Sequence, residues 1–174
     1  MPEIYDFSDV PDAVVSEFHR LAAENLDGTI QIAIAADVRA TTLAGIFGGG
    51  SVALLAAVAT IIAGGVEKYQ MFVLPSVIAA ICLFFGAALC AWSGRPIDFF
   101  VGGYEPKLLQ QSATDLTWML RYAAEDMQVR IDANRAALAR DAKYLQCGMI
   151  AAILGVATAG IILIWPWATS GRLF

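Results

Sequence analysis

The chain has 174 residues, of which 59% are hydrophobic, and its mean hydropathy is +0.65. Soluble domains contain about 45–50% apolar residues, so this composition argues against an ordinary soluble domain. The net charge is −5, and no basic cluster of the kind that tracks phosphates is present. These two features exclude the electrostatic footprint of a nucleic-acid-binding protein.

The apolar excess lies in three stretches without a charged residue: Ala40–Val66, Tyr69–Gly94 and Tyr144–Gly171. Each stretch is longer than the roughly 20 residues that a helix needs to cross a bilayer. A charge at the centre of a spanning helix costs about 2.5–3.5 kcal/mol on insertion scales, so a bilayer requires this absence of charge. We therefore predict an all-α integral membrane protein with three transmembrane helices and cytoplasmic amphipathic helices.

Residues 1–39 predict a cytoplasmic acidic leader and an amphipathic helix, which begins near Asp9–Asp12 with a capping side chain and an early proline. Asp27-Gly28 is a candidate interruption of this helix. The alternation in Ile30–Ile34 is typical of a strand, but we favour a helix because a lone strand at a membrane surface leaves its backbone unpaired. We expect no cleavable signal peptide, since the first apolar stretch follows an acidic leader and not a short basic start.

Residues 40–94 predict a transmembrane helical hairpin. Its two spans are expected near Ala40–Gly64 and Met71–Trp92, and Gly65–Gln70 is only long enough for a tight loop between them. Trp92 lies where an aromatic residue of the membrane interface belongs.

Residues 95–143 predict a cytoplasmic linker followed by a helix that runs from Pro106 to Lys143. Residues 144–174 predict the third transmembrane helix, near Leu145–Trp165, and a short external tail. No helix breaker separates these two helices, so we expect them to form one long helix, part in water and part in lipid.

Small residues mark the faces on which these helices can pack closely. Gly45 and Gly49 form a GxxxG pair, which allows another helix to approach. Along the last helix, a heptad-like seam follows alternating steps of four and three: Leu120, Ala124, Met127, Ile131, Asn134, Leu138, Asp141, Leu145, Gly148, Ala152, Gly155 and Ala159. Such a seam is typical of helix pairing in water and then in lipid. Self-association into a homo-oligomer and packing inside one subunit both fit it.

Lysine and arginine residues orient the chain. The segment between the second and third spans carries a dense group of them: Arg95, Lys107, Arg121, Arg130, Arg135, Arg140 and Lys143. The hairpin loop carries only Lys68 and the C-terminal tail only Arg172. By the positive-inside rule, residues 95–143 and the N terminus are cytoplasmic, and the C terminus is external.

Motifs for catalysis or metal binding are absent from the sequence. Cys82, Cys90 and Cys147 lie in the predicted spans without a CxxC or Cys/His pattern, so we interpret them as small apolar side chains. The single histidine, His19, lies on a polar helix. No ionisable residue falls inside a span, which argues against an ion or proton relay. We therefore expect no enzymatic activity, no metal and no cofactor.

Two short runs resemble a known family. Ala36-Asp37-Val38-Arg39-Ala40 resembles the Ala-Asp-x-Lys/Arg-Ala entry into the first span of the small transmembrane effectors of the Pycsar antiphage system. The run Asn134–Leu145, which includes Lys143, is similar to the basic helix ahead of the final membrane segment in those proteins. The architecture matches over about residues 20–168, whereas the motif match covers only these two runs.

This resemblance implies a function. A partner pyrimidine nucleotide cyclase would make cyclic CMP or cyclic UMP on sensing phage. The effector, a multi-pass protein of the bacterial cell inner membrane, would respond by impairing membrane integrity and so cause abortive infection. The cyclic pyrimidine nucleotide is then the activating ligand. Arg121, Arg130 and Arg135 are candidates to contact its phosphate, and the alternative interpretation of each is a plain surface charge. An accessory or structural subunit of a larger membrane complex, and a constitutive small channel, remain alternatives.

Overall fold

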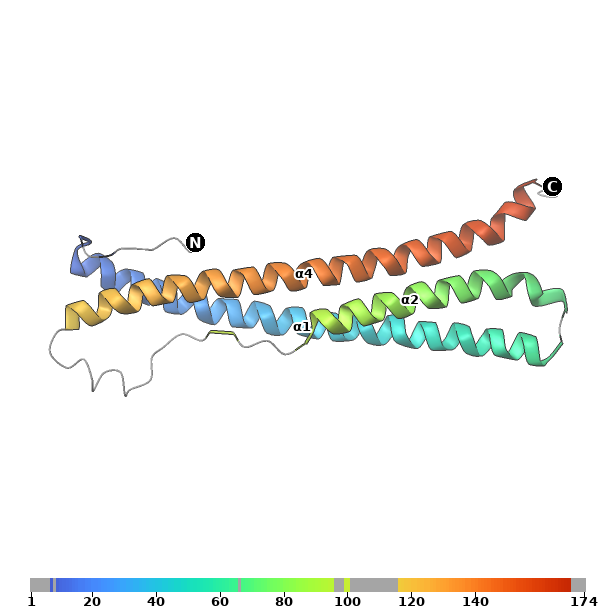
Figure 1. The fold of residues 1–174 in the computed structure, drawn as a ribbon, viewed down its shortest axis with the longest axis horizontal. Helices are drawn as coiled ribbons and strands as arrows, with labels where there is room; N and C mark the ends of the chain where they lie inside the picture. Colours follow the sequence, from blue (N-terminus) through green and yellow to red (C-terminus); the bar gives the residue numbers. More distant parts are fainter. Residues whose placement is uncertain (1–6, 8, 66, 96–98, 101–115, 170–174) are drawn as a thin grey trace. The chain divides into compact units, whose positions relative to one another are not determined.

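The computed structural model describes residues 7, 9–65, 67–95, 99–100 and 116–169. Within these residues all regular structure is helical, as predicted, and no strand occurs. The elements are α1 (Asp12–Ala63), a 3₁₀ helix η1 (Glu67–Phe72), α2 (Val73–Ser93) and α4 (Leu116–Thr169) (Figure 1). Three helical stretches, Asp12–Ala63, Tyr69–Ser93 and Trp118–Trp165, are long and apolar enough to cross a membrane.

Helix α1 is continuous through Asp27 and Gly28, so the predicted candidate interruption does not occur. A glycine inside a helix costs about 1 kcal/mol relative to alanine. Leu26 and Ala33 on either side are 0% and 4% exposed, and burial of apolar groups on this scale outweighs that cost. The same continuity shows that Ile30–Ile34 is helical, as favoured above.

The connection between α1 and α2 is a tight turn. Gly64 donates its N–H to the carbonyl of Thr60 at 2.9 Å, and Gly65 has a φ of +60°, which a glycine adopts without strain. The predicted loop is partly helical, because η1 leads directly into α2. Pro75 lies in the first turn of α2, where the missing N–H has no partner to lose.

Helix α4 is a single helix from Leu116 to Thr169, so the prediction of one long helix is confirmed for these residues. The predicted start at Pro106, the acidic leader up to residue 6 and the C-terminal tail after residue 169 lie outside the described residues.

The chain divides into two compact units. Unit 1 comprises Met1–Ala35 and Pro96–Arg140, and unit 2 comprises Ala36–Arg95 and Asp141–Phe174. Helices α1 and α4 therefore each contribute to both units, whereas α2 belongs to unit 2 alone.

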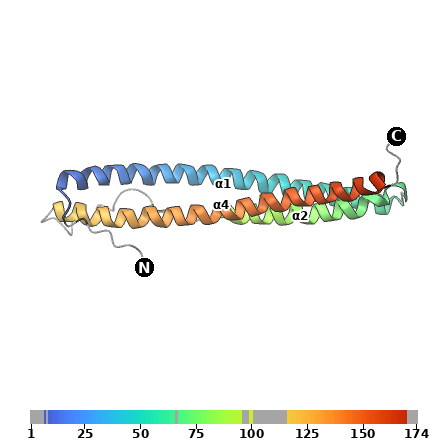
Figure 2. The same cartoon turned by 90° about the horizontal axis from the view of Figure 1, so that it is seen from above.

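Unit 1 is a parallel pair formed by the first parts of α1 and α4, which lie side by side in both views (Figures 1 and 2). Near the start of both helices, Asp12 pairs with Arg121 at 3.0 Å. Farther along both, a core cluster joins α1 to α4, with Phe18 packed against it: Ala22, Leu26, Met127 and Ile131. Because the order of contacts is the same along both helices, the two run in the same direction.

The buried residues of unit 1 follow heptad spacing on both helices. On α1 they include Val15, Ala22, Leu26, Thr29 and Ala33, and on α4 Ala124, Met127, Ile131 and Asn134. Steps of four and three keep one face of each helix against its partner, which is the geometry of a coiled coil.

Unit 2 contains α2 and the second parts of α1 and α4. Helix α2 lies antiparallel to α1. Ser51 contacts Ala80, whereas Gly94, beyond the end of α2, is so near Ala40 that an added Cβ would lie 3.3 Å from the Cβ of Ala40. Figures 1 and 2 show α2 alongside this part of α1. The hydroxyl of Ser51 donates to the carbonyl of Ala80 at 2.8 Å and is thereby satisfied in an apolar setting.

Many large apolar side chains of unit 2 point outward, and the buried residues of this unit are mostly small. More than half of the area of these exposed residues is accessible: Ile46, Val52, Ile62, Leu74, Phe84, Phe85, Ile150, Ile153, Leu154, Val156, Ile161 and Ile164. The buried residues of unit 2 include Ala40, Ser51, Ala79, Ala80, Cys90 and Ala152. Soluble proteins rarely expose apolar patches of this extent, whereas helices in lipid pack through small residues.

Replacing Leu26 with alanine is expected to destabilise unit 1 by about 2–5 kcal/mol, because it removes a fully buried side chain and leaves a cavity. Hydrogen exchange of amides in the first parts of α1 and α4 measures the opening free energy. Leu21→Ala is the matched control, since Leu21 is 49% exposed on the same helix. Equal effects of the two substitutions would contradict the assigned core.

Candidate functional site

Glycines of α4 form the closest helix contact in unit 2. A Cβ added to Gly155 would overlap the Cβ of Cys82, and one added to Gly148 would lie 2.9 Å from both the Sγ of Cys90 and the carbonyl oxygen of Gly86. Gly86 itself would place a Cβ 2.9 Å from the carbonyl oxygen of Gly148. The backbones of α2 and α4 therefore approach each other at distances that only glycine allows.

The predicted small-residue seam of α4 is thus used inside one chain. Ala152 and Ala159, which lie between and beyond these glycines, are 3% and 8% exposed. The sequence left two interpretations of the seam, self-association and packing inside one subunit. In the structure, the seam packs against α2 of the same chain. The sequence analysis did not predict the face of α2 that meets this seam. Its residues Cys82, Gly86 and Cys90 follow one another at four-residue spacing, which is a pattern that indicates one face of a helix.

The other predicted pair of glycines has a different environment. A Cβ added to Gly45 or Gly49 would meet no atom within 4 Å, and both residues are exposed. On the neighbouring face, a Cβ added to Gly48 or Gly50 would instead meet Ala87 or Leu83 of α2. The GxxxG face of α1 is consequently open in this chain.

A polar contact joins α2 to α4 at the end of α2. The hydroxyl of Ser93 donates to the backbone carbonyl of Asp141 at 2.8 Å, and the two residues are 6% and 8% exposed. The next residue, Gly94, lies close to α1, since an added Cβ would be 3.3 Å from the Cβ of Ala40 and 3.7 Å from the carbonyl oxygen of Asp37. The hydrogen bond from Ser93 to Asp141 was not predicted from the sequence, because its acceptor is a main-chain carbonyl.

The residues of the family-like motifs are placed in both units. Asp37, Arg39 and Lys143 belong to unit 2, whereas Asn134 belongs to unit 1. Arg39 and Lys143 are exposed, and Asp37 is half-buried. Asn134 is the most enclosed of the four, with 2% of its area accessible.

Asn134 holds the main chain of Phe100 with both ends of its amide. The Nδ2 group donates to the carbonyl of Phe100 at 2.9 Å, and Oδ1 accepts the N–H of the same residue at 3.0 Å. The guanidinium of Arg130 lies 5.8 Å from the centre of the Phe100 ring, and its Nε contacts Oδ2 of Asp126 at 2.7 Å. Backbone and ring of Phe100 are therefore both held by α4.

Arg121 holds the residues that precede α1. Its guanidinium donates to the carbonyl of Val10 at 3.1 Å and to Oδ1 of Asp12 at 3.0 Å. The N–H of Phe7 donates to Glu125 at 3.4 Å, and the Phe7 ring lies 4.8 Å from that of Phe18. Phe7 and Val10, ahead of α1, thus contact the helix pair of unit 1.

The three arginines proposed to meet a phosphate each have a carboxylate partner. Arg121 pairs with Asp12, Arg130 with Asp126, and Arg135 with Asp132 at 4.0 Å. A phosphate that bound any of them would compete with that carboxylate. Arg135 is the most exposed of the three, with 63% of its side chain accessible.

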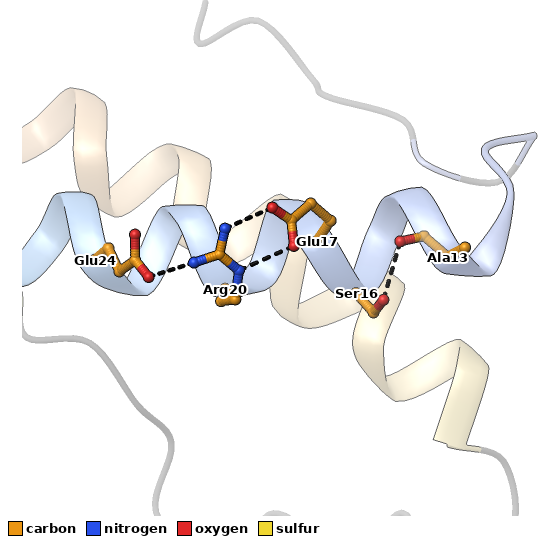
Figure 3. Close-up of polar contacts among 5 residues, drawn as sticks. All are labelled: Ala13, Ser16, Glu17, Arg20 and Glu24. Atoms are coloured by element: carbon orange, nitrogen blue, oxygen red, sulfur yellow. Dashed lines mark hydrogen bonds and ion pairs between the residues drawn. The ribbon is translucent and has the colours of Figure 1, made fainter.

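A separate charged cluster lies on the exposed face of α1 (Figure 3). Arg20 donates to Glu17 at 2.6 Å and also bonds Glu24, one turn away in the other direction. Hydrogen bonding from Arg20 lowers the pKa of Glu17 below its ordinary value. Because all three side chains are more than half exposed, solvent screens the interaction, and we interpret the cluster as a solvated helix face.

Among the residues that the structure describes, no group of three or more His, Cys, Asp or Glu side chains is arranged to hold a metal ion. Cys82 is half-buried, Cys90 buried and Cys147 exposed, and none of the three forms a disulfide. No family model, curated protein or solved structure matches the chain.

Replacing Gly155 with isoleucine is expected to destabilise unit 2. The loss should exceed the roughly 1–3 kcal/mol that is typical of overpacking a core, because the new side chain would overlap Cys82 of α2. The thermal stability of the full chain in detergent measures this. Gly160→Ile is the matched control, since a Cβ at Gly160 meets nothing within 4 Å. If both variants keep the stability of the wild type, the α2–α4 contact is incorrect.

Proposed function

We propose that the chain is a membrane effector of an antiphage defence system, located in the bacterial inner membrane with unit 2 in the bilayer and unit 1 in the cytoplasm. The observation that carries the membrane part is the exposure of large apolar side chains on unit 2 around a small-residue core. The orientation follows from the basic residues between the second and third spans. The defence role follows from the sequence resemblance around Asp37, Arg39, Asn134 and Lys143.

The proposed effector is silent until a cytoplasmic signal arrives. Helices α1 and α4 each contribute to the polar unit and to the apolar unit, which supports coupling between a signal in one and a response in the other. A ligand shifts such an equilibrium only by binding one state more tightly. Moving it from mostly silent to mostly active takes about 5.5 kcal/mol of differential binding.

The proposed activating ligand is a cyclic pyrimidine nucleotide, cyclic CMP or cyclic UMP, made by a partner cyclase. Charge-assisted hydrogen bonds contribute about 1.5–3 kcal/mol each, so a few contacts to one phosphate supply the required difference. Arg121, Arg130 and Arg135 of unit 1 are the candidate donors, and the phosphate would replace the carboxylate with which each of them now pairs. The proposal involves no catalysis, metal or resident cofactor.

To test this function, the chain is expressed alone and together with an active or a catalytically dead pyrimidine nucleotide cyclase. Membrane potential and dye uptake are followed in each strain. We expect loss of integrity only with the active cyclase. Integrity that is already lost without a cyclase would favour the constitutive channel, and integrity that is unaffected by the nucleotide would favour the accessory subunit.

We also propose that the chain forms a homo-oligomer through the open face of α1. Gly45 and Gly49 are exposed and unobstructed, and Ala53, four residues on, is also exposed. A row of small residues at four-residue spacing lets the helix of a second copy approach closely in lipid.

Gly49→Ile is expected to shift the chain from oligomer to monomer in native-membrane crosslinking, while the thermal stability of the monomer in detergent stays unchanged. Gly155→Ile is expected to do the reverse, lowering monomer stability first. An oligomer distribution that is identical in Gly49→Ile and wild type would contradict assembly through this face.

A further inference from the structure

Asn134 occupies a core position of the helix pair in unit 1. It is 2% exposed and lies three residues after Ile131, on the heptad seam that packs against α1. A buried asparagine in a coiled coil usually pairs with a polar residue of the opposite helix and so specifies register. Here both polar ends of the amide are instead satisfied by Phe100, which belongs to neither helix.

The contact involves the main chain of Phe100 and not its side chain. The amide of Asn134 binds the N–H and the C=O of one residue, much as a neighbouring strand would. The ring of Phe100 lies 5.8 Å from the Arg130 guanidinium, and the residue as a whole is 48% exposed. Water can therefore replace Asn134 as the partner of Phe100.

Asn134 depends more strongly on this contact, because only 2% of its area is exposed while Phe100 is docked. In its buried position, an amide that loses Phe100 is left without hydrogen bonds, which is costly in a core. The present packing of α1 against α4 is consequently more favourable while Phe100 is docked than after it has left. Once Phe100 leaves, the helix pair lowers its free energy by turning Asn134 toward solvent.

We propose that Asn134 makes the silent packing of the helix pair conditional on docked Phe100, so that undocking of Phe100 and repacking of α1 against α4 are one switch. The inference rests on the proposed function where it assigns this packing to the silent state. Its structural part, the dependence of the pair on Phe100, stands independently.

Four variants separate this switch from a purely structural role. Asn134→Leu makes the core apolar and removes its dependence on Phe100. Asn134→Asp keeps the size of the side chain but cannot donate to the carbonyl of Phe100. Phe100→Ala retains the main-chain contact. Asn25→Asp makes the same chemical change at an exposed position of α1.

Hydrogen exchange on the full chain in nanodiscs reports the packing of the pair. We expect amides of α1 and α4 in unit 1 to exchange about tenfold faster in Asn134→Asp, which corresponds to about 1.4 kcal/mol of opening free energy. Exchange should be slower than wild type in Asn134→Leu and unchanged in Phe100→Ala and Asn25→Asp. Faster exchange in Asn134→Leu, or wild-type exchange in Asn134→Asp, would overturn the conditional core.

Dye uptake with and without the active cyclase tests the gating part. Asn134→Asp should lose membrane integrity without the cyclase, and Asn134→Leu should stay intact even with it. If the wild type responds to the cyclase and both variants respond like it, the switch is wrong while the effector function stands. If the wild type does not respond, the effector function fails, and hydrogen exchange still decides the conditional core.

Discussion

The contact between the backbones of α2 and α4 at Gly148 and Gly155 is the constraint on which unit 2 depends. In lipid, apolar side chains gain little by leaving their surroundings, so helices associate through close packing and hydrogen bonds. Close packing requires that nothing project between the helices, and at Gly155 even one carbon would overlap Cys82. Two buried hydroxyls add hydrogen bonds to backbone carbonyls, that of Ser93 between α2 and α4 and that of Ser51 between α1 and α2.

One seam of α4 forms two different kinds of interface. In unit 1 it presents Met127 and Ile131 to Leu26 of α1, where burial of large apolar groups stabilises the pair. In unit 2 it presents Gly148, Ala152 and Gly155 to α2. The same alternation of four and three residues therefore positions both interfaces, and the change in residue size along the seam follows the change in the force that holds the helices together.

Much of this architecture could be predicted from the sequence, because charge-free stretches and heptad spacing are local patterns. The three apolar helices and the continuity of α4 are examples. Which glycines pack could not be predicted, since Gly45 and Gly155 look alike in sequence and differ only in the rotation of their helices relative to α2. The partner of Asn134 was equally hidden, because a main-chain acceptor and donor can belong to any residue. The contact of Ser93 with Asp141 could not be predicted for the same reason, since its acceptor is a main-chain carbonyl.

The antiparallel placement of α2 between segments distant in the chain has a consequence for biosynthesis. The end of α4, Thr169, follows the end of α2, Ser93, by 76 residues. At about 5–20 residues per second, a ribosome needs roughly 4–15 s to complete that stretch. During this interval the hairpin of α1 and α2 is complete, but the face with Cys82, Gly86 and Cys90 still lacks α4. Nascent hairpins on neighbouring ribosomes expose the same small-residue face, so the rate of translation sets how long a hairpin is open to an exchange of partners.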